Sequence, residues 1–276
     1  MRNVLRGVAL VTVLVVLGGV VVWWATRRPV KPSPGCVVAV VSDAGAMSTD
    51  PAAGAFELTP EQAGNAATIA AVGAKMGMPD HAVSVALATA LQESRLVNLP
   101  GGDRDSAGLF QQRPSQGWGT YAQITDPVAA STAFYRHLSA QAGWTQLSVT
   151  QAAQLVQHSA APQAYAQWED EARAIAVALT GEAPATLSCH DLTITGPTAD
   201  LARTADAEWG TGKLSGPHNL ARDWAIGSWL VAHAAGLGVD SVTVDGRTWT
   251  ADSGKWSETS AADGTVALHQ ATVSRS

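Results

Sequence analysis

Residues 59–94 carry the signals of two successive helices, and the second helix is apolar on more than one side. Thr59 suits an N-cap and Pro60 the first helical position, while Gln62 completes a capping box. The second helix is expected to begin at Asp80 and to be largely buried. Its apolar positions are Val83, Val85, Leu87, Ala88, Ala90 and Leu91. A helix of this kind belongs to the interior of a domain.

Further helices follow this pair. Residues 126–140 are expected to form one that starts after the cap Asp126. Residues 148–181 carry a longer helical pattern, which Pro162 is expected to break. Residues 59–181 are therefore predicted to be all-helical.

The pattern changes in the last third of the chain. Residues 218–239 are typical of a helix ended by glycine, and Asp245-Gly246 between two alternating runs predicts a β-hairpin. A third strand is expected within residues 264–273. Five tryptophans in this region suggest carbohydrate binding, but the two in the helix are expected to pack inside. These elements predict a small α+β domain of unknown role.

The N-terminal run of residues 7–25 contains no charged residue and is long enough to cross a bilayer as one helix. Trp23 and Trp24 stand at its end, where interfacial aromatic residues belong. A cleaved signal peptide is the alternative, but its apolar region is usually shorter and no clean cleavage site follows. We expect an uncleaved membrane anchor, whose orientation is left open by basic residues on both sides.

The predicted fold class is α+β overall, with a transmembrane helix, an all-helical domain and a small C-terminal α+β domain. The length of 276 residues allows one or two domains. The expected boundaries are an anchor at 1–27, a proline-rich linker at 28–58, the helical domain at 59–182 and the α+β domain at 183–276.

Composition and charge exclude several classes of function. With 46% hydrophobic and 14% charged residues, the chain is not expected to be generally disordered. Its formal net charge of −6 supplies no basic field for nucleic acid, which we exclude as a partner. His81, His137 and His158 are widely spaced, so no metal site is expected, and no motif indicates a cofactor.

The chain has two cysteines, Cys36 and Cys189. One pair in an exported protein is typical of a disulfide, which here would close the central region into a ring. Two inert thiols are the alternative interpretation. We expect the disulfide and a soluble region outside the cytoplasm.

Glu93 is a candidate general acid because it comes near the end of the buried helix in a chain poor in charge. Apolar surroundings and the negative end of the helix dipole both disfavour the carboxylate, so both are expected to raise its pKa. A raised pKa suits a group that must hold a proton near neutral pH. Arg95 and Arg104 would oppose this effect if they approached the carboxyl group.

The strings "ESRLVN" and "DSAGLFQQRP" resemble those of the lysozyme-like superfamily that includes soluble lytic transglycosylases and goose-type lysozymes. That family carries a catalytic Glu in an E-S motif at a helix end, followed by a G-L-M-Q motif. Residues 108–111 match the second motif, with Phe in place of Met. The longer strings "ALATALQES" and "VQHSAAPQAYA" look more like an actinobacterial cell-wall branch of the group. The resemblance covers residues 59–181.

The resemblance implies a lysozyme-like fold for the helical domain and peptidoglycan glycan strands as its partner. Glu93 would then protonate the glycosidic oxygen between N-acetylmuramic acid and N-acetylglucosamine. The candidate substrate-binding residues are Ser94, Phe110, Gln111, Gln112, Gln157 and Tyr165. Gln157 and Tyr165 are included because this chain lacks the A-Y-N-A-G motif that usually follows in transglycosylases.

Most glycosidases use two carboxylates, but a lytic transglycosylase needs one, because the muramic sugar's own C6 hydroxyl attacks the anomeric carbon. Asp103 and Asp105 are nearby acids that suit a turn, and Asp126 suits a helix cap. Trp118 and Tyr121 would suit sugar stacking, although core packing is the more common role of such aromatics.

The sequence therefore predicts a peptidoglycan lytic transglycosylase with Glu93 as its single catalytic acid. A muramidase that uses water needs the same glutamate and is the nearest alternative. A non-catalytic cell-wall-binding or scaffold protein is another, favoured by the missing A-Y-N-A-G motif and the large C-terminal region. Protein partners are left unknown by the sequence.

Overall fold

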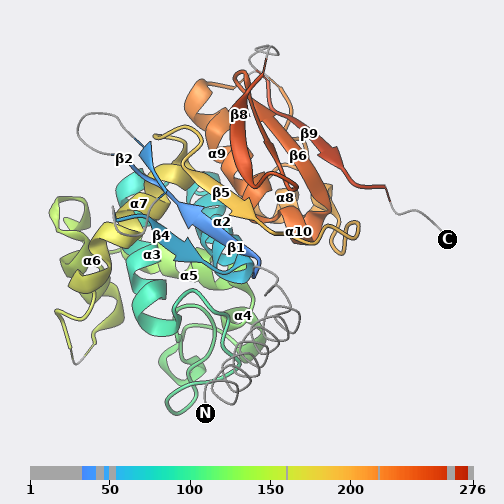
Figure 1. Cartoon of the computed structure of the whole chain (residues 1–276). Helices are drawn as coiled ribbons and strands as arrows, with labels where there is room; N and C mark the ends of the chain where they lie inside the picture. The colour runs from blue at the N-terminus through green and yellow to red at the C-terminus, as the bar shows by residue number, and fades with distance from the viewer. Residues whose placement is uncertain are drawn as a thin grey trace, which may run out of the picture. The chain divides into compact units, whose positions relative to one another are not determined.

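The described chain combines a group of helices with three small sheets of two to four strands each (Figure 1). The structure is a computed structural model that describes residues 33–41, 47–49, 54–159, 161–216, 218–259 and 265–272. The strands are β1 Gly35–Val38, β2 Val40–Val41, β3 Met47–Ser48, β4 Phe56–Leu58, β5 Leu187–His190, β6 Val239–Val244, β7 Arg247–Thr250, β8 Lys255–Glu258 and β9 Ala267–Gln270. The α-helices are α2 Pro60–Lys75, α3 Asp80–Ser94, α4 Tyr121–Ile124, α5 Pro127–Ser139, α6 Val149–Gln157, α7 Glu169–Thr180, α8 Leu201–Trp209, α9 Leu220–Ala232 and α10 Ala234–Leu237. Short 3-10 helices are η2 Pro114–Gln116, η3 Trp144–Gln146 and η4 Ala166–Trp168.

The first two helices begin where the sequence predicts. Thr59 caps α2 by accepting a hydrogen bond from the Gln62 backbone, and the Gln62 side chain returns one to the Thr59 backbone. α3 begins at Asp80 and its apolar residues are buried on both sides, as expected. It packs against α2, α5, α6 and α7, which together exclude water from it. The prediction of a buried central helix is confirmed.

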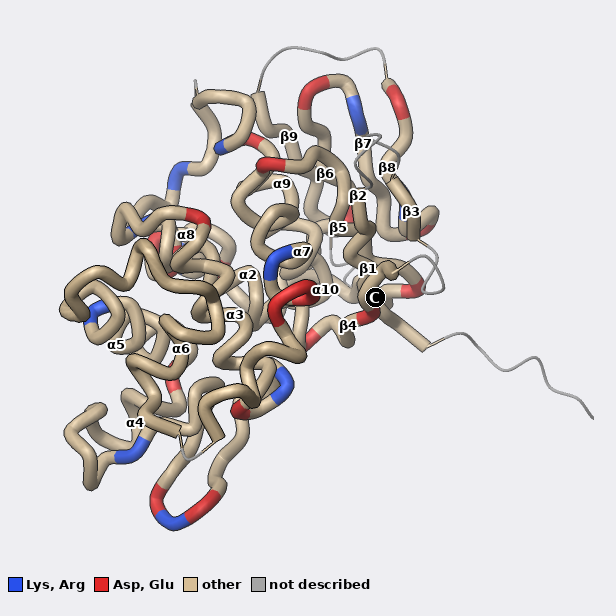
Figure 2. Tube along the Cα trace, turned by 90° about the vertical axis from the view of Figure 1, so that its left-hand side faces the viewer, with Lys and Arg blue, Asp and Glu red and all other residues tan. Residues whose placement is uncertain are grey.

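The later helices also follow their local signals. Asp126 caps α5 by accepting a hydrogen bond from the Ala129 backbone at 2.8 Å. The pattern at 148–181 divides into α6, η4 and α7, and the interruption contains Pro162. Helix α6 carries no charged residue, whereas the charged residues of α7 gather in its first half (Figure 2).

Three short strands form a sheet from residues that flank the helices in sequence. The strand order is β4-β1-β5, and both pairings are antiparallel. Cys36 in β1 stands directly opposite Cys189 in β5, and the two form the predicted disulfide with a sequence separation of 153. The disulfide prediction is confirmed. The strands β1 and β4 lie within the stretch expected to be a linker.

The C-terminal sheet has the order β8-β7-β6-β9, with antiparallel neighbours throughout. Its β6–β7 hairpin turns at Asp245 and Gly246, whose φ values of 44° and 72° suit the predicted two-residue turn. The predicted third strand is β9, whereas β8 and helix α8 were not predicted. Helix α9 packs against β6 and β5, so it contacts the C-terminal sheet and also the sheet β4-β1-β5.

Two tryptophans fasten the C-terminal sheet to β5. Trp249 in β7 and Trp256 in β8 stand opposite each other. Trp249 Nε1 donates to the Cys189 carbonyl at 3.1 Å, and Trp256 Nε1 donates to the Leu187 carbonyl at 2.8 Å. The indole groups thus satisfy carbonyls on the edge of β5 that has no neighbouring strand in the described residues.

The predicted fold class is wrong and needs correction. The described residues are α+β, and none of their helices has the length and apolar character needed to cross a bilayer. The predicted anchor at 1–27 lies outside the described residues. Residues 34–276 form one compact unit, because β1 and β5 pair across the ends of the helical region and α9 contacts both their sheet and the C-terminal sheet. The pairing of β4, β1 and β5 was not predicted because short strands with partners distant in sequence leave little local signal.

Candidate functional site

Glu93 lies in the last turn of α3, where the helix ends in an unusual backbone geometry. Arg95 and Leu96 both have positive φ, of 56° and 59°. The two carbonyls of this turn are held by α2, since Gln62 donates to Arg95 at 2.8 Å and Asn65 donates to Leu96 at 2.7 Å. The end of α3 is therefore fixed by hydrogen bonds from a neighbouring helix.

The Glu93 carboxyl group is half-buried and has a tyrosine as its hydrogen-bond partner. The Tyr165 hydroxyl donates to Glu93 Oε1 at 3.1 Å. Burial raises the pKa of Glu93 above its ordinary value, and the hydrogen bond from Tyr165 opposes that rise. Tyr165 is itself fully buried, and burial followed by the negative charge of Glu93 raises its pKa. The tyrosine therefore remains a proton donor to the carboxylate.

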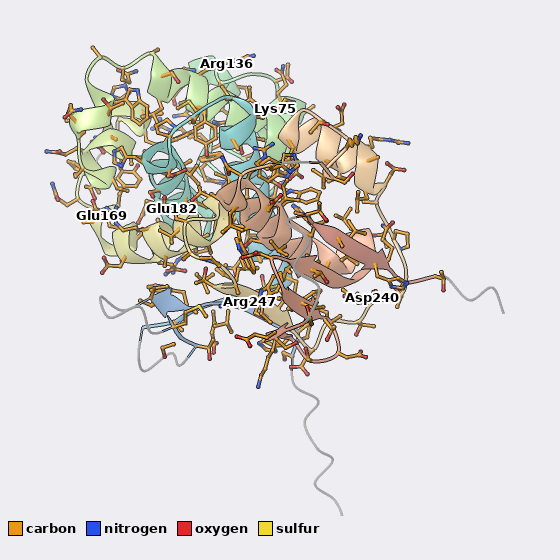
Figure 3. The ribbon with its side chains drawn as sticks, turned by 90° about the horizontal axis from the view of Figure 1, so that it is seen from above. Lys75, Arg136, Glu169, Glu182, Asp240 and Arg247 are labelled. Atoms are coloured by element: carbon orange, nitrogen blue, oxygen red, sulfur yellow. A yellow bond between two sulfur atoms is a disulfide. The ribbon has the colours of Figure 1, made fainter. Side chains whose placement is uncertain are left out.

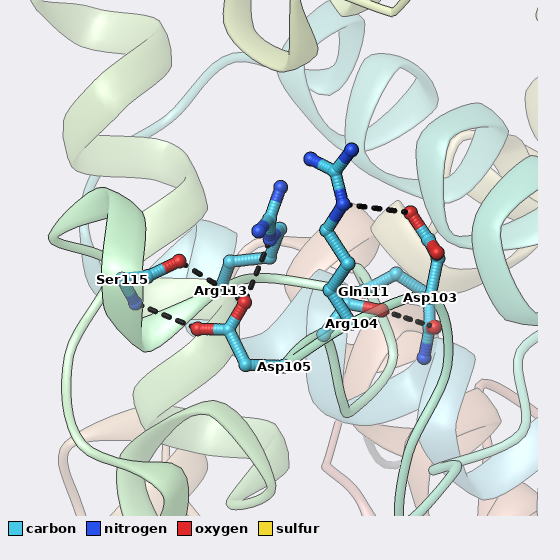
Figure 4. Close-up of polar contacts among 7 residues, drawn as sticks. Asp103, Arg104, Asp105, Gln111, Arg113 and Ser115 are labelled. Carbon is cyan, nitrogen blue, oxygen red and sulfur yellow. Dashed lines mark hydrogen bonds and ion pairs between the residues drawn. The ribbon is translucent and has the colours of Figure 1, made fainter.

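The two arginines that would lower the pKa of Glu93 if they approached it, Arg95 and Arg104, have other partners. The Arg95 guanidinium lies 3.9 Å from the centre of the Trp168 ring. Arg104 is exposed and lies 3.9 Å from the Asp103 carboxylate (Figure 4). Among the described residues, no ion pair is formed by Glu93. A carboxyl group in this setting has little to stabilise its charge apart from one hydroxyl.

A second set of contacts holds the Tyr165 segment against α3, and sequence reasoning missed it. The Gln92 side-chain oxygen accepts from Trp168 Nε1 at 2.8 Å and from Gln167 Nε2 at 3.1 Å. Together with the Arg95–Trp168 contact, these bonds place η4 beside the end of α3. Gln92 and Arg95 lie within two residues of Glu93, so the sequence could have indicated that they stand near the acid. No short-range pattern in the sequence indicated that Trp168 would contact them.

The loop after α3 doubles back as the turn-rich sequence predicts. Gly108 donates its backbone N–H to the Leu99 carbonyl at 2.8 Å, and the Ser94 hydroxyl donates to the Leu109 carbonyl at 2.7 Å. Ser94 is buried, so its hydroxyl ties the helix end to the returning loop. Gly102 lies against this loop, where an added Cβ would be 1.7 Å from the Gln111 side-chain oxygen.

The predicted substrate-binding residues lie around this loop, but several turn inward. Phe110 is buried and stacks on Phe134 with ring centres 4.8 Å apart. The Gln157 side chain donates to the Phe110 carbonyl at 3.1 Å, which joins the end of α6 to the loop. Gln112 is buried and donates to the Ala130 carbonyl at 3.2 Å. Contact of these residues with a substrate stays a prediction.

Gln111 is half-buried beside the same loop, and its amide serves the loop itself. Its oxygen accepts from the Ser106 hydroxyl at 3.0 Å, and its nitrogen donates to the Gly108 carbonyl at 3.1 Å. The hydrogen-bond partner of Glu93 is therefore Tyr165, whereas the Gln111 amide forms its hydrogen bonds within the loop after α3.

The three aspartates considered as a second carboxylate have structural partners. Asp105 accepts from Arg113 Nε at 2.8 Å and from the Ser115 backbone at 2.8 Å (Figure 4). The Arg113 bond, followed by those from Ser115, holds the pKa of Asp105 well below its usual range. Asp103 is exposed beside Arg104, and Asp126 caps α5. These are the turn and cap roles that the sequence predicts.

Two aromatics near the loop differ in exposure. Trp118 stacks on His137 with ring centres 4.0 Å apart, so one of its faces is covered. Tyr121 is 54% exposed and donates its hydroxyl to the Pro100 carbonyl at 2.7 Å. In the C-terminal region Trp224 and Trp229 are 1% exposed, so their predicted place in the interior is confirmed.

Cavity volume points to other parts of the molecule than Glu93. A cavity of about 610 Å³ lies between β5 and β8, where His190, Arg247 and Trp256 are among its lining residues. Another of about 410 Å³ lies between β2 and α7. Neither is lined by Glu93. Acid–base chemistry depends first on a carboxyl group within reach of its substrate and then on its pKa, so we weigh the setting of Glu93 above enclosed volume.

Comparison with known proteins adds no family. No protein-family model matches the chain, and no curated protein sequence matches it either. The motif resemblance and the geometry around Glu93 are therefore the features that bear on function.

Proposed function

We propose that this protein is a peptidoglycan lytic transglycosylase that cleaves the bond between N-acetylmuramic acid and N-acetylglucosamine. Its single catalytic acid is Glu93. The observation that carries the proposal is the half-buried Glu93 carboxyl group, held by the Tyr165 hydroxyl at 3.1 Å and paired with no cation among the described residues.

The proposed reaction uses Glu93 twice. Because burial raises its pKa, the Glu93 carboxyl group keeps its proton to higher pH than an ordinary glutamate, and in its protonated form it donates to the glycosidic oxygen as the bond breaks. The resulting carboxylate then accepts the proton of the muramic C6 hydroxyl, which attacks the anomeric carbon. The Tyr165 hydrogen bond stabilises that transient carboxylate. The cycle returns the proton to Glu93, so atoms and charge balance without a second acid.

The roles of Asp103, Asp105 and Asp126 support a mechanism with one carboxylate. Asp105 is committed to Arg113 and Ser115, and Asp126 to the N-terminus of α5. A hydrolytic muramidase that activated water through Asp105 or Asp126 would have to take that group away from its partner. Transglycosylation makes no such demand.

Digestion of purified sacculi by the full-length protein tests the proposal. The wild type should release muropeptides lighter by one water than hydrolysis products, because they carry the anhydro ring. Glu93→Gln should lose about 10²–10⁴-fold in rate, the usual contribution of a general acid. Glu61→Gln is the matched control, because Glu61 is exposed in the first turn of α2.

Each other outcome has a definite meaning. Full-mass reducing ends with a Glu93-dependent rate would establish a muramidase instead. Binding of sacculi without digestion by the wild type would favour the non-catalytic cell-wall protein. Equal digestion by wild type and Glu93→Gln would remove Glu93 from the catalytic role.

The same proposal places the described region in an oxidising compartment outside the cytoplasm, where peptidoglycan is found. The Cys36–Cys189 disulfide supports this, because such bonds persist mainly in oxidising environments. Protein taken from intact cells should resist alkylation at both cysteines until a reductant is added. Free thiols in that sample would contradict the assignment.

A further inference from the structure

A small cavity lies at the opposite end of α3 from Glu93. Its volume is about 250 Å³, and its lining comes from α2, α3, α7, α8 and α9. The polar and charged lining residues are Asp80, Thr180, Trp209, Asn219 and Arg222. Pockets for drug-sized ligands are about 300–1,000 Å³, so this one suits a smaller molecule.

One side of the cavity offers donors that lack acceptors. Trp209 is 4% exposed, and its indole N–H has no hydrogen-bond partner among the described residues. The Arg222 guanidinium lies 4.1 Å from the centre of the Trp209 ring and forms no ion pair with a described carboxylate. Burial lowers the pKa of Arg222. The buried Trp209 N–H is costly unless an acceptor reaches it, whereas the half-buried Arg222 is partly open to solvent.

The start of α9 adds partial positive charge near Trp209 and Arg222. Asn219 caps the helix, and Arg222 stands in its first turn. A helix N-terminus carries a partial positive charge that favours an anion. This alone would not define a site, but here it coincides with the unpaired Trp209 N–H and the unpaired Arg222.

The cavity also has an acidic lining residue, Asp80, which is the first residue of α3. Glu182, which follows the end of α7 and is labelled in Figure 3, does not line the cavity but forms a hydrogen bond with Asp80. Burial, followed by a hydrogen bond and charge repulsion from Asp80, raises the pKa of Glu182, while Thr180 and Arg173 oppose the rise. A simple anion in the cavity would face Asp80, and a simple cation would face Arg222. A molecule with both charges satisfies both sides.

We propose that this cavity binds a small amino acid as a zwitterion. Its carboxylate pairs with Arg222 and accepts the Trp209 N–H, and its ammonium group pairs with Asp80. The inference is independent of the reaction proposed for Glu93, so either can fail without the other.

Isothermal titration calorimetry on the full-length protein with glycine and alanine tests the site. Both should bind, whereas acetate and methylammonium, which carry one charge each, should bind at least about tenfold more weakly because each forfeits one pairing. Binding of acetate as tight as that of glycine would overturn the zwitterion assignment. Absence of binding by glycine and alanine would overturn the site.

Variants locate the binding. Arg222→Gln should weaken glycine binding at least about tenfold, and the exposed Arg203→Gln in α8 is its matched control. Trp209→Phe keeps an aromatic ring near Arg222 and removes the N–H together with one of the two rings of the indole, so it tests the site even if Arg222→Gln fails to fold. Unchanged affinity in Trp209→Phe and in a folded Arg222→Gln would place the ligand elsewhere and contradict the proposal.

Discussion

The Tyr165 hydroxyl donates a hydrogen bond to Glu93 Oε1 at 3.1 Å across 72 positions of sequence. The bond favours the ionised form of an acid whose surroundings otherwise disfavour ionisation. Tyr165 is fully buried, so its direction is set by packing as well as by this contact. Tyr165 therefore holds the Glu93 carboxyl group in one position and lowers its pKa.

Removing this bond should change the pH dependence of the proposed reaction. Tyr165→Phe loses the contact that lowers the Glu93 pKa, so that pKa should rise further. Activity that needs protonated Glu93 should then persist to higher pH, and the alkaline limb of the rate profile should move upward. Side-chain NMR of labelled Glu93 measures the same pKa without activity. Tyr121→Phe, which loses only the bond to Pro100, should leave both unchanged.

Glu93 should also reduce stability at neutral pH. Its folded pKa is raised above the unfolded value, so its ionised form is disfavoured in the folded state. Wild type therefore has its full stability below the unfolded pKa of Glu93 and loses part of it as pH rises through the folded pKa. Glu93→Gln should match wild type at low pH and exceed it at neutral pH in urea unfolding. Parallel curves over that range would contradict the pKa shift.

Gly108 should tolerate substitution far less than Gly117. Both have positive φ, 79° and 82°, so alanine meets about 1–2 kcal/mol of backbone strain at either position. At Gly108 the added Cβ would also be 1.8 Å from the Ile124 carbonyl oxygen, whereas nothing lies within 4 Å at Gly117. Gly108→Ala should therefore cost at least about 3 kcal/mol of unfolding free energy. Equal losses in chemical denaturation would show that the loop after α3 can shift freely.

The disulfide should be a major contributor to stability. Replacing Cys36 and Cys189 together by serine opens a link with a separation of 153 residues. The expected loss is about 2–5 kcal/mol in unfolding free energy, mainly through the greater freedom of the unfolded chain. Thermal unfolding with and without reductant measures it. A wild type indifferent to reductant would mean that packing alone holds β1 to β5.

The elements that could be predicted are those whose signals are local. The capping box at Thr59, the aspartate before α5 and the Asp245-Gly246 turn each act within a few residues, and each was placed correctly. The sheet β4-β1-β5 was missed because its strands have three or four residues and β1 meets β5 across almost the whole helical region. No periodicity develops in so few residues.

The candidate site likewise contains one residue that the sequence could indicate and contacts that it could not. Glu93 could be found because a helix end and a motif lie in one short stretch of sequence. The contacts that define its surroundings span long separations, such as the 76 positions between Gln92 and Trp168. Ser94 and Gln112 are both buried, and each donates a hydrogen bond to a backbone carbonyl inside the fold. The motif did not indicate these structural contacts, and a contact of either residue with a substrate stays a prediction.

The cross-link between Cys36 and Cys189 also determines how the chain carries tension. A pull applied between the segment before Cys36 and the C-terminal sheet passes through the sulfur atoms and bypasses residues 37–188. The helices that position Glu93 therefore lie outside the covalent path between these two segments while the bond is intact. Reduction would place them directly in the line of force.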